Sequence, residues 1–320
     1  MRKIILGRTG RSVSAVSFGT WAHGGPNSSA GGQPIGWSGH DDRLAEAALI
    51  RAWELGINHW DTADVYGEGN SEQLIGRAFE TVPREEIFLA SKVGWNQGDY
   101  PHYYHPTLMR KRLERTLQNL RVDMVDLFYF HHCLFGKKNE LLEPALEAML
   151  QFREEGKIQF IGLSDWNCRK IMKVVDRINP DVIQPYRNVR DDDYAASGLR
   201  QWINDNNTGV VFFSPLRHGL LTGKYNAPAT FTAGDFRSGV PEFRDAGFIA
   251  RTQTNRRLLE ERFATHPQPV LHGLSGALLT DAPTGCVLLG QRNPQQVEAA
   301  ATLGEPLSAA ESAWVFSLYQ

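Results

Sequence analysis

The 320-residue sequence predicts an α/β fold, a (β/α)8 TIM barrel with a long loop between strands 7 and 8. Short apolar runs alternate with longer amphipathic runs along the chain, which indicates a parallel sheet with helical crossovers. The alternation yields eight strand-plus-helix units and the length suits a closed barrel, which needs roughly 250 residues plus insertions. An open dinucleotide-binding sheet should carry G-x-G-x-x-G after its first strand, and this chain does not. No linker is evident, so residues 1–320 are predicted to form one domain.

The predicted elements follow one another as strand and helix in turn. The clearest helix covers residues 42–55, and Gly56 is well placed to end it. Its apolar face consists of Leu44, Ala48, Ala52 and Leu55. Predicted strands cover residues 13–20, 57–60, 87–93, 124–131, 158–163, 182–184, 210–213 and 286–289. The other predicted helices cover residues 71–79, 107–120, 142–155, 167–178, 194–206 and 294–302.

Residues 225–247 are the least regular stretch, rich in Pro, Gly, Ala, Asp and Thr. They lie in a long segment that follows the seventh strand and ends near residue 265. A loop of that length inside a compact domain is usually functional. We therefore predict a flap over one mouth of the barrel.

Composition and charge narrow the class of protein. Lys and Arg total 34 against 36 Asp and Glu, which gives no basic excess for nucleic acid or an anionic membrane. The three cysteines, Cys133, Cys168 and Cys286, stand far apart and fit a reducing compartment. The first residues contain too short an apolar run for a signal peptide, and no stretch approaches the ~20 apolar residues of a membrane span. We expect a cytoplasmic protein.

Polar residues stand at the predicted carboxyl ends of several strands, where a barrel of this type has its active site. Asp61 ends the second strand, Tyr66 follows it, and Lys92 ends the third. A free phenol has a pKa of about 10, and an adjacent ammonium would lower it, so Tyr66 beside Lys92 could act as a general acid. Asp61 could hold Lys92 charged, and a neutral histidine could orient a carbonyl oxygen. Asp61 and Lys92 could equally form a structural ion pair.

The fourth strand ends at two histidines. Side chains of His131 and His132 point to opposite faces of a strand, so only one readily enters the mouth. The same alternation makes His131, His132 and Cys133 a poor metal cage. No metal site is predicted.

Aromatic residues crowd the loops after strands one and three, which favours an apolar substrate pocket. We expect Trp21 and Trp95 to contact substrate. The other aromatic and histidine side chains of these loops are His23, Trp37, Tyr100, Tyr103 and Tyr104. These side chains could also simply pack against the protein beneath a loop.

At residues 61–72 the chain reads D-T-A-D-V-Y-G-E-G-N-S-E, which resembles the D-T-A-x-x-Y-G-x-G-x-S-E signature of the aldo-keto reductases. Further blocks are similar to that family: S-K-V at 91–93, G-L-S at 162–164, S-P-L at 214–216, and G-Q-R-N-P-Q-Q-V at 290–297. The resemblance runs from about residue 6 to residue 302. It implies a catalytic tetrad of Asp61, Tyr66, Lys92 and His131, with NADPH/NADP+ bound across the barrel mouth.

The resemblance also implies the residues that hold the cofactor. Ser164, Asp165 and Gln184 match contacts of the nicotinamide carboxamide, and Phe213 matches the aromatic that stacks on the nicotinamide ring. The pyrophosphate segment matches Ser214, Leu216, Gly219, Leu221 and Lys224. The region that grips the 2′-phosphate and the adenine side matches Gly290, Arg292 and Gln296.

Three positions depart from the family pattern. Asp165 stands where many members have Asn, and a carboxylate can accept from a carboxamide but cannot donate to it. Phe213 replaces a frequent Tyr, which keeps the stacking surface. Ala300 stands where an adenine-binding Asn is common.

The resemblance implies reduction of a small aldehyde or ketone, with hydride from the nicotinamide and a proton from Tyr66. An alternative is a cofactor-binding regulatory subunit with little turnover, because potassium-channel β subunits look similar over the same blocks. A metal-dependent barrel hydrolase or isomerase would need strand ends rich in metal ligands. NADH in place of NADPH, and the oligomeric state, stay open at this point.

Overall fold

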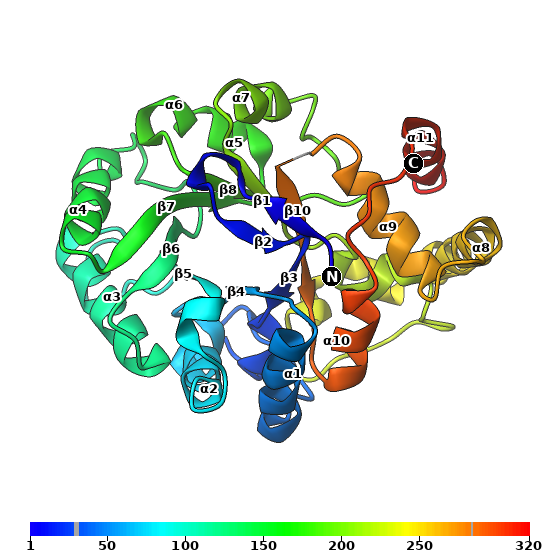
Figure 1. Ribbon diagram of the computed structural model, residues 1–320, viewed down its shortest axis with the longest axis horizontal. Coiled ribbons are helices and arrows are strands. Elements are labelled where there is room, and N and C mark those ends of the chain that lie inside the picture. Colours follow the sequence, from blue (N-terminus) through cyan, green and yellow to red (C-terminus); the bar gives the residue numbers. More distant parts are fainter. Residues whose placement is uncertain (29–31, 283) are drawn as a thin grey trace.

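A computed structural model describes residues 1–28, 32–282 and 284–320. Eight parallel strands close into a barrel in the order β10-β3-β4-β5-β6-β7-β8-β9. Helices form a ring outside these strands (Figure 1). The predicted (β/α)8 fold is confirmed.

The barrel strands are β3 (Val16–Gly19), β4 (His59–Asp61), β5 (Phe88–Val93), β6 (Val125–Phe130), β7 (Ile158–Asp165), β8 (Val182–Pro185), β9 (Gly209–Phe212) and β10 (Gly285–Gly290). Their register brings polar residues to the same level at the carboxyl ends. Gly19 pairs with Asp61, and Ser164 pairs with Gln184. The mouth therefore collects side chains from strands that are distant in the sequence.

The predicted strand 13–20 is two strands joined at Ala15. Its first part, β2 (Ser12–Ser14), pairs antiparallel with β1 (Lys3–Ile5), which the sequence did not reveal. The hairpin lies across the amino-terminal end of the barrel (Figure 1). Ile4, Leu6 and Val13 are buried with side chains of the barrel interior, so the hairpin closes that end.

The helices are α1 (Asp42–Glu54), α2 (Asn70–Ala78), α3 (Pro106–Leu120), α4 (Leu142–Glu154), α5 (Cys168–Met172), α6 (Val175–Ile178), α7 (Leu199–Asp205), α8 (Ala246–Arg262), α9 (Pro269–Leu279), α10 (Pro294–Ala301) and α11 (Ala309–Ser317). The predicted helix 167–178 is interrupted between α5 and α6, and α9 and α11 were not predicted. Within the described residues, no helix combines the length and apolarity needed to span a membrane.

The helices α1 and α9 differ from the prediction in which of their side chains are buried. In α1, Ala45 and Leu49 join Ala48 and Ala52 on the buried face, whereas Leu44 is 46% exposed, so the predicted face was rotated. In α9 every residue from Gly273 to Leu279 is buried. A helix buried all round shows no amphipathic period, and the sequence pattern therefore misses it.

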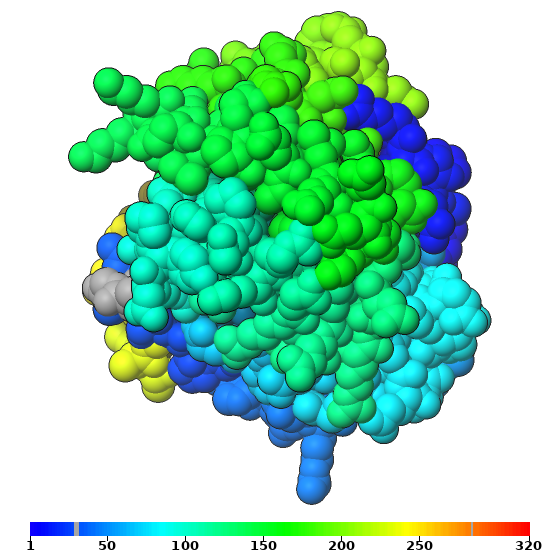
Figure 2. Space-filling model, turned by 90° about the vertical axis from the view of Figure 1, so that its left-hand side faces the viewer, coloured from blue at the N-terminus to red at the C-terminus, as the bar shows by residue number. Residues whose placement is uncertain are grey.

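The segment 225–247 is not a structureless loop. It contains the 3-10 helices η6 (Phe236–Gly239) and η7 (Pro241–Arg244). Gly36 forms a parallel bridge with Asp235, and Ser38 Oγ donates to Asp235 Oδ2 at 2.6 Å. The segment therefore lies against the loop that follows β3. In the side view, residues of this region (yellow) and the hairpin (dark blue) lie at opposite ends (Figure 2).

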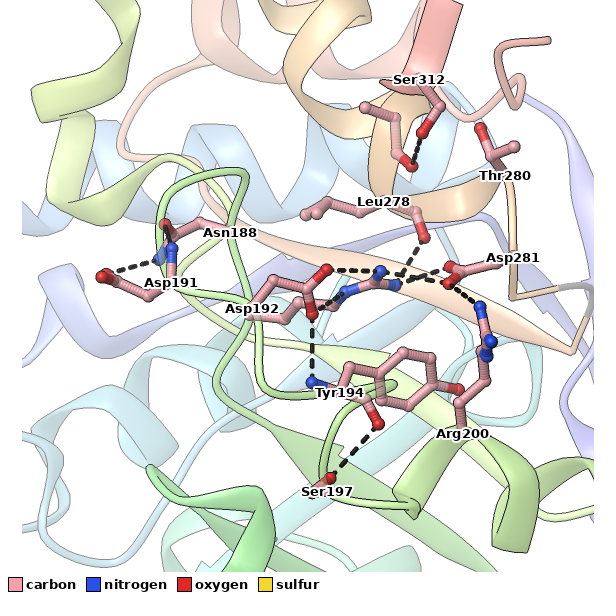
Figure 3. A network of polar contacts seen from close by, with 12 residues as sticks. Asn188, Asp191, Asp192, Tyr194, Ser197, Arg200, Leu278, Thr280, Asp281 and Ser312 are labelled. Carbon is pink, nitrogen blue, oxygen red and sulfur yellow. Dashed lines mark hydrogen bonds and ion pairs between the residues drawn. The ribbon is translucent and has the colours of Figure 1, made fainter. Parts of the chain in front are cut away.

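A buried arginine ties the loop after β8 to α9 (Figure 3). Arg187 is 2% exposed, and its guanidinium donates to both Asp192 and Asp281 and to the Leu278 carbonyl. The same guanidinium lies 4.5 Å from the ring centroid of Tyr194. Every N–H of this cation is therefore satisfied within the protein, and we interpret the cluster as structural.

We expect Arg187→Met to lower the free energy of unfolding by about 3 kcal/mol, because it leaves two carboxylates without their shared cation. Urea unfolding followed by circular dichroism measures the change. Arg200→Met is the matched control, since Arg200 also donates to Asp281 but its side chain is 46% exposed. The control should lose under about 1 kcal/mol. Equal losses in the two variants would contradict a special role for the buried cation.

Candidate active site

Four polar side chains meet at the carboxyl ends of the strands. Asp61 ends β4 and Lys92 lies in β5, while Tyr66 begins the 3-10 helix η3 (Tyr66–Gly69). Lys92 Nζ donates to Asp61 Oδ1 and to the Thr62 carbonyl, and it lies 3.4 Å from the Tyr66 hydroxyl. The His131 ring, just after β6, is 5.9 Å from the Tyr66 ring between centroids. The four residues of the predicted tetrad thus lie together.

The ion pair at the centre is held on all sides. Asp61 and Lys92 are each 1% exposed. Gln184 Nε2 donates to Asp61 Oδ2 at 2.8 Å, so both carboxylate oxygens have a donor. A buried ion pair is stable only where further hydrogen bonds compensate for lost hydration, and this pair has them.

Burial decides the protonation states. It lowers the pKa of Lys92 and raises the pKa of Asp61, and in each case the partner's charge opposes it. Burial and the charges of Asp61 and Asp64 raise the pKa of Tyr66 well above its usual value. We expected the Lys92 ammonium to lower that pKa. The ammonium does not lower the pKa of Tyr66, because the Asp61 carboxylate already neutralises its charge at close range.

The neighbouring histidine is uncharged. Burial and the Lys92 charge hold the pKa of His131 well below its usual range. Tyr66 is therefore a neutral phenol, and His131 a neutral imidazole, at physiological pH. The His132 side chain is instead packed within the protein, where its Nδ1 accepts a hydrogen bond from the Leu134 N–H at 3.3 Å.

The turn that carries Tyr66 is fixed by contact between two backbones. Gly67 has φ +63°, and a Cβ at this position would lie 2.1 Å from the Gly24 carbonyl oxygen. Asn27 Nδ2 also donates to the Val65 carbonyl at 3.2 Å. The loop after β3 thus holds the Tyr66 turn against the barrel mouth.

Tryptophans flank the tetrad on two sides. The Trp21 ring stacks on Tyr66 at 6.1 Å, and Trp95 meets His131 edge to face at 5.8 Å. Both predicted substrate residues therefore lie beside the polar centre. Trp37 packs on Trp21 at 5.5 Å between ring centroids, but two other predicted pocket residues do not line this space. The His23 ring is buried against the Gln291 carbonyl, and the Tyr104 hydroxyl is bonded to the backbone of His132.

Three aromatic side chains at the mouth escaped the sequence analysis. Phe236 packs on Trp21 at 5.0 Å between ring centroids, which brings the 225–247 segment to the mouth. Trp166 lies edge-on to Phe213 at 4.9 Å, and the His218 ring is 6.0 Å from Trp21. Trp166 directly follows Asp165 at the end of a strand, Phe236 lies in the segment predicted as a flap, and His218 lies in the predicted pyrophosphate segment.

The loop after β9 contains several residues with left-handed backbone conformation. Ser214, Arg217, His218 and Gly219 have φ values of +57°, +45°, +59° and +85°. The N–H groups of Arg217 and Gly219 are bonded within the loop, to the carbonyls of Ser214 and Leu216. Leu216 lies within this turn, and the Lys224 side chain lies close to Gly219. Leu221 is buried, and its carbonyl accepts from the Tyr319 hydroxyl.

Arg292 lies where β10 ends at Gly290 and α10 begins. Asn293 caps the helix by accepting from the Gln296 N–H at 2.9 Å, and Gln296 Oε1 accepts from the Arg292 N–H at 2.8 Å. The Arg292 guanidinium donates to the carbonyls of Ser38 and Gly39. Helix N-termini favour phosphate groups.

The residues predicted to contact the nicotinamide carboxamide lie on two adjacent strands. Ser164, Asp165 and Gln184 are buried at the ends of β7 and β8. Asp165 accepts from the main-chain N–H groups of Cys133 and Asn167, at 2.8 and 2.9 Å. Its carboxylate is thus largely engaged by its own loop.

A barrel mouth with a buried Tyr–Lys–Asp–His cluster fits an oxidoreductase that uses a nicotinamide dinucleotide. The sequence profile described as Aldo/keto reductase family matches residues 15–318. The chain belongs to the aldo-keto reductase family. Members of this family are NAD(P)H-dependent enzymes that act on small carbonyl substrates.

Known proteins agree with this assignment. The NADP(+) aldo-keto reductase yakc of Schizosaccharomyces pombe is 31% identical over 229 residues, 69% of this chain and 65% of yakc. An NADH-specific methylglyoxal reductase of Escherichia coli is 30% identical over 236 residues, 70% of each chain. The structure of a glycerol dehydrogenase from Gluconobacter oxydans matches with a TM-score of 0.78 at 27% identity, over 96% of this chain and 92% of the other. The matched region thus spans just under two thirds of yakc.

Gly67→Ala should lower the free energy of unfolding by about 3 kcal/mol, because it adds a clash with the Gly24 backbone to the strain of a left-handed alanine. Gly98→Ala is the matched control. Gly98 has φ +53°, but a Cβ there would meet nothing within 4 Å, so only the strain of about 1 kcal/mol is expected. Chemical unfolding of both variants measures the difference. Similar losses would mean that the Gly24–Gly67 contact does not constrain the turn.

Proposed function

We propose that this chain reduces aldehydes or ketones to alcohols with NADPH, and that Tyr66 donates the proton to the carbonyl oxygen. The observation that carries the proposal is the neutral Tyr66 hydroxyl 3.4 Å from Lys92 Nζ, with Lys92 itself bound to Asp61. A phenol in this position is protonated before reaction, and a cation stands next to the oxygen that becomes negative.

The proton transfer follows from these contacts. The carbonyl oxygen accepts a hydrogen bond from Tyr66, and the neutral His131 imidazole orients it with a second. When bound, the cofactor supplies a hydride to the carbonyl carbon. As the oxygen gains charge, Tyr66 gives up its proton, and the Lys92 ammonium stabilises the resulting phenolate. Solvent then returns a proton to Tyr66.

Asp61 and Gln184 act on Lys92 and not on the substrate. Asp61 keeps the ammonium charged despite its burial, and Gln184 keeps Asp61 in place. Without this support, burial alone would favour a neutral amine, which could not stabilise the phenolate.

The residues that would hold the cofactor fit its chemistry. The left-handed turn at 214–219 suits the pyrophosphate, with Leu216, Gly219, Leu221 and Lys224 forming that segment. Phe213 offers a flat face to the nicotinamide, beside Ser164, Asp165 and Gln184. Trp21 and Trp95 border the space above Tyr66 and His131, which favours a small substrate with an apolar group.

The first test is NADPH oxidation with a panel of aromatic and aliphatic aldehydes and ketones, run beside Tyr66→Phe. We expect turnover by the wild type and a 100- to 10,000-fold lower rate in the variant, roughly the range for loss of a general acid. Cofactor affinity, measured by fluorescence titration, should be unchanged. A variant within tenfold of wild type would remove Tyr66 as proton donor. NADPH binding without turnover of any carbonyl would favour a cofactor-binding regulatory subunit.

Preference for NADPH over NADH should depend on Arg292. No carboxylate pairs with this guanidinium among the described residues, so its charge is available to a 2′-phosphate. Arg292→Met should weaken NADPH binding about 10- to 100-fold, as expected for a lost charge-assisted bond, and leave NADH binding nearly unchanged. Lys224→Met is the control, because the pyrophosphate is common to both cofactors and both affinities should fall together. Equal effects of Arg292→Met on the two cofactors would contradict the assignment.

A further inference from the structure

His218, in the loop after β9, is a side chain at the barrel mouth to which the proposed reaction gives no role. Its backbone is left-handed, with φ +59°, between Arg217 at +45° and Gly219 at +85°. Residues other than glycine adopt this conformation rarely, and those that do gather at functional sites. The conformation of this turn therefore directs attention to what the imidazole contacts.

The imidazole lies against an aromatic wall, which we define by four side chains: Trp21, Trp37, Trp166 and Phe236. They come from the loop after β3, the end of β7 and the segment 225–247. Between ring centroids, the imidazole is 4.9 Å from Phe236, 6.0 Å from Trp21 and Trp37, and 6.3 Å from Trp166. His218 is thus a polar group set into an apolar surface.

The imidazole is the one ring of this group that carries both a hydrogen-bond donor and an acceptor. Within the part of the chain that the structure describes, neither of its nitrogens has a hydrogen-bond partner. The neighbouring Trp21, by contrast, already donates from Nε1 to the Ile35 carbonyl at 2.8 Å. A polar group that loses water to a bound ligand weakens binding unless the ligand replaces the lost hydrogen bond. A ligand that covers His218 should therefore bring a polar group of its own.

The charges around His218 favour an uncharged ligand group. Burial, and then the charges of Arg217 and Arg237, lower the pKa of His218 to about 3, so the imidazole is neutral at physiological pH. Arg217 is itself paired with Asp191. Arg237 is paired with Asp235. Neither the imidazole nor these two cations is left to balance a carboxylate or a phosphate on the ligand.

We propose that His218 is a specificity-determining residue that hydrogen-bonds a hydroxyl group of the substrate, at the end remote from the reacting carbonyl. A hydroxyl suits this place, because it can donate to one nitrogen of a neutral imidazole or accept from the other. The inference rests on the proposed reduction, since Tyr66 marks the position of the carbonyl.

The arrangement of the rings also indicates the shape of the substrate. Trp21 stacks on Tyr66 at 6.1 Å and borders His218 at 6.0 Å, so one indole separates the proton donor from the imidazole. A substrate that reaches both must cross this indole with a flat or apolar body. The expected substrate class is therefore an uncharged aldehyde or ketone with an apolar middle and a hydroxyl at its far end.

A matched pair of aldehydes tests the role of His218. 4-(Hydroxymethyl)benzaldehyde and 4-ethylbenzaldehyde have nearly the same shape, and a hydroxyl in the first replaces a methyl group in the second. The ratio of their kcat/KM values in NADPH-dependent reduction measures the preference for the hydroxyl. His218→Phe keeps a ring in place and removes both nitrogens, so this ratio should fall about tenfold, as expected for one lost hydrogen bond.

Two further variants separate the hydrogen bond from packing. His218→Gln retains a donor and an acceptor and should restore most of the ratio. Phe236→Leu changes the packing of the wall without changing a polar group, so it should lower both kcat/KM values together and leave their ratio unchanged. If urea unfolding shows that His218→Phe does not fold, His218→Gly gives the same test, because glycine suits a φ of +59°.

A third aldehyde tests the charge of the preferred group. 4-Carboxybenzaldehyde carries an anion where the first compound carries a hydroxyl. It should be reduced less efficiently by the wild type, since burying a charge without a partner is costly. A preference for the carboxylate would contradict the assignment of an uncharged group.

A binding measurement separates failure of this inference from failure of the proposed reduction. Quenching of tryptophan fluorescence follows binding of each aldehyde to Tyr66→Phe in the presence of NADP+, where no reduction can occur. Adding His218→Phe should lower the ratio of the two affinities by about the same factor as in the kinetics. An affinity ratio that does not change would overturn the role of His218, whether or not the wild type reduces carbonyls. Weaker NADPH binding by His218→Phe with an unchanged ratio would also overturn it and assign the side chain to the cofactor.

Discussion

The ion pair between Lys92 and Asp61 is the interaction on which the rest of the site depends. Both groups are almost fully buried, and neither would keep its charge there alone. Gln184 and the Thr62 carbonyl complete their hydrogen bonds from β8 and from the loop after β4. The barrel makes this arrangement possible, because its closed sheet brings four strand ends to one point.

The pair also explains why Tyr66 is neutral. A free ammonium 3.4 Å from a phenol would favour the phenolate, but an ammonium already paired with a carboxylate has little net charge to offer. Burial and nearby carboxylates then keep the proton on Tyr66. The cation acts on the phenolate only as that phenolate forms, which is when stabilisation lowers a barrier.

A second constraint joins two loops across the mouth. Asp235 accepts from Ser38, which is 197 residues away in the chain, and from Arg237 on its own turn. Burial opposes ionisation of Asp235, but the bonds from Arg237 and Ser38 lower its pKa to about 2. The contact thus stays charged at any physiological pH. It holds Phe236 against Trp21, and so the aromatic wall of the site depends on it.

The sequence by itself determined the barrel and placed Asp61, Tyr66 and Lys92 at strand ends, while the choice of His131 over His132 came from the resemblance to the family. Alternating apolar runs are a local property of the sequence. The polar residues at the ends of the strands can also be recognised locally, before the arrangement of the strands is known. It could not reveal β1, which is too short for a period, or α9, which has no polar face. Only the tertiary structure decided that Tyr66 keeps its proton and that Trp166 lies in the mouth. Each of these depends on burial and on charges brought from distant strands and helices. A local sequence pattern contains information on neither the burial nor the distant charges.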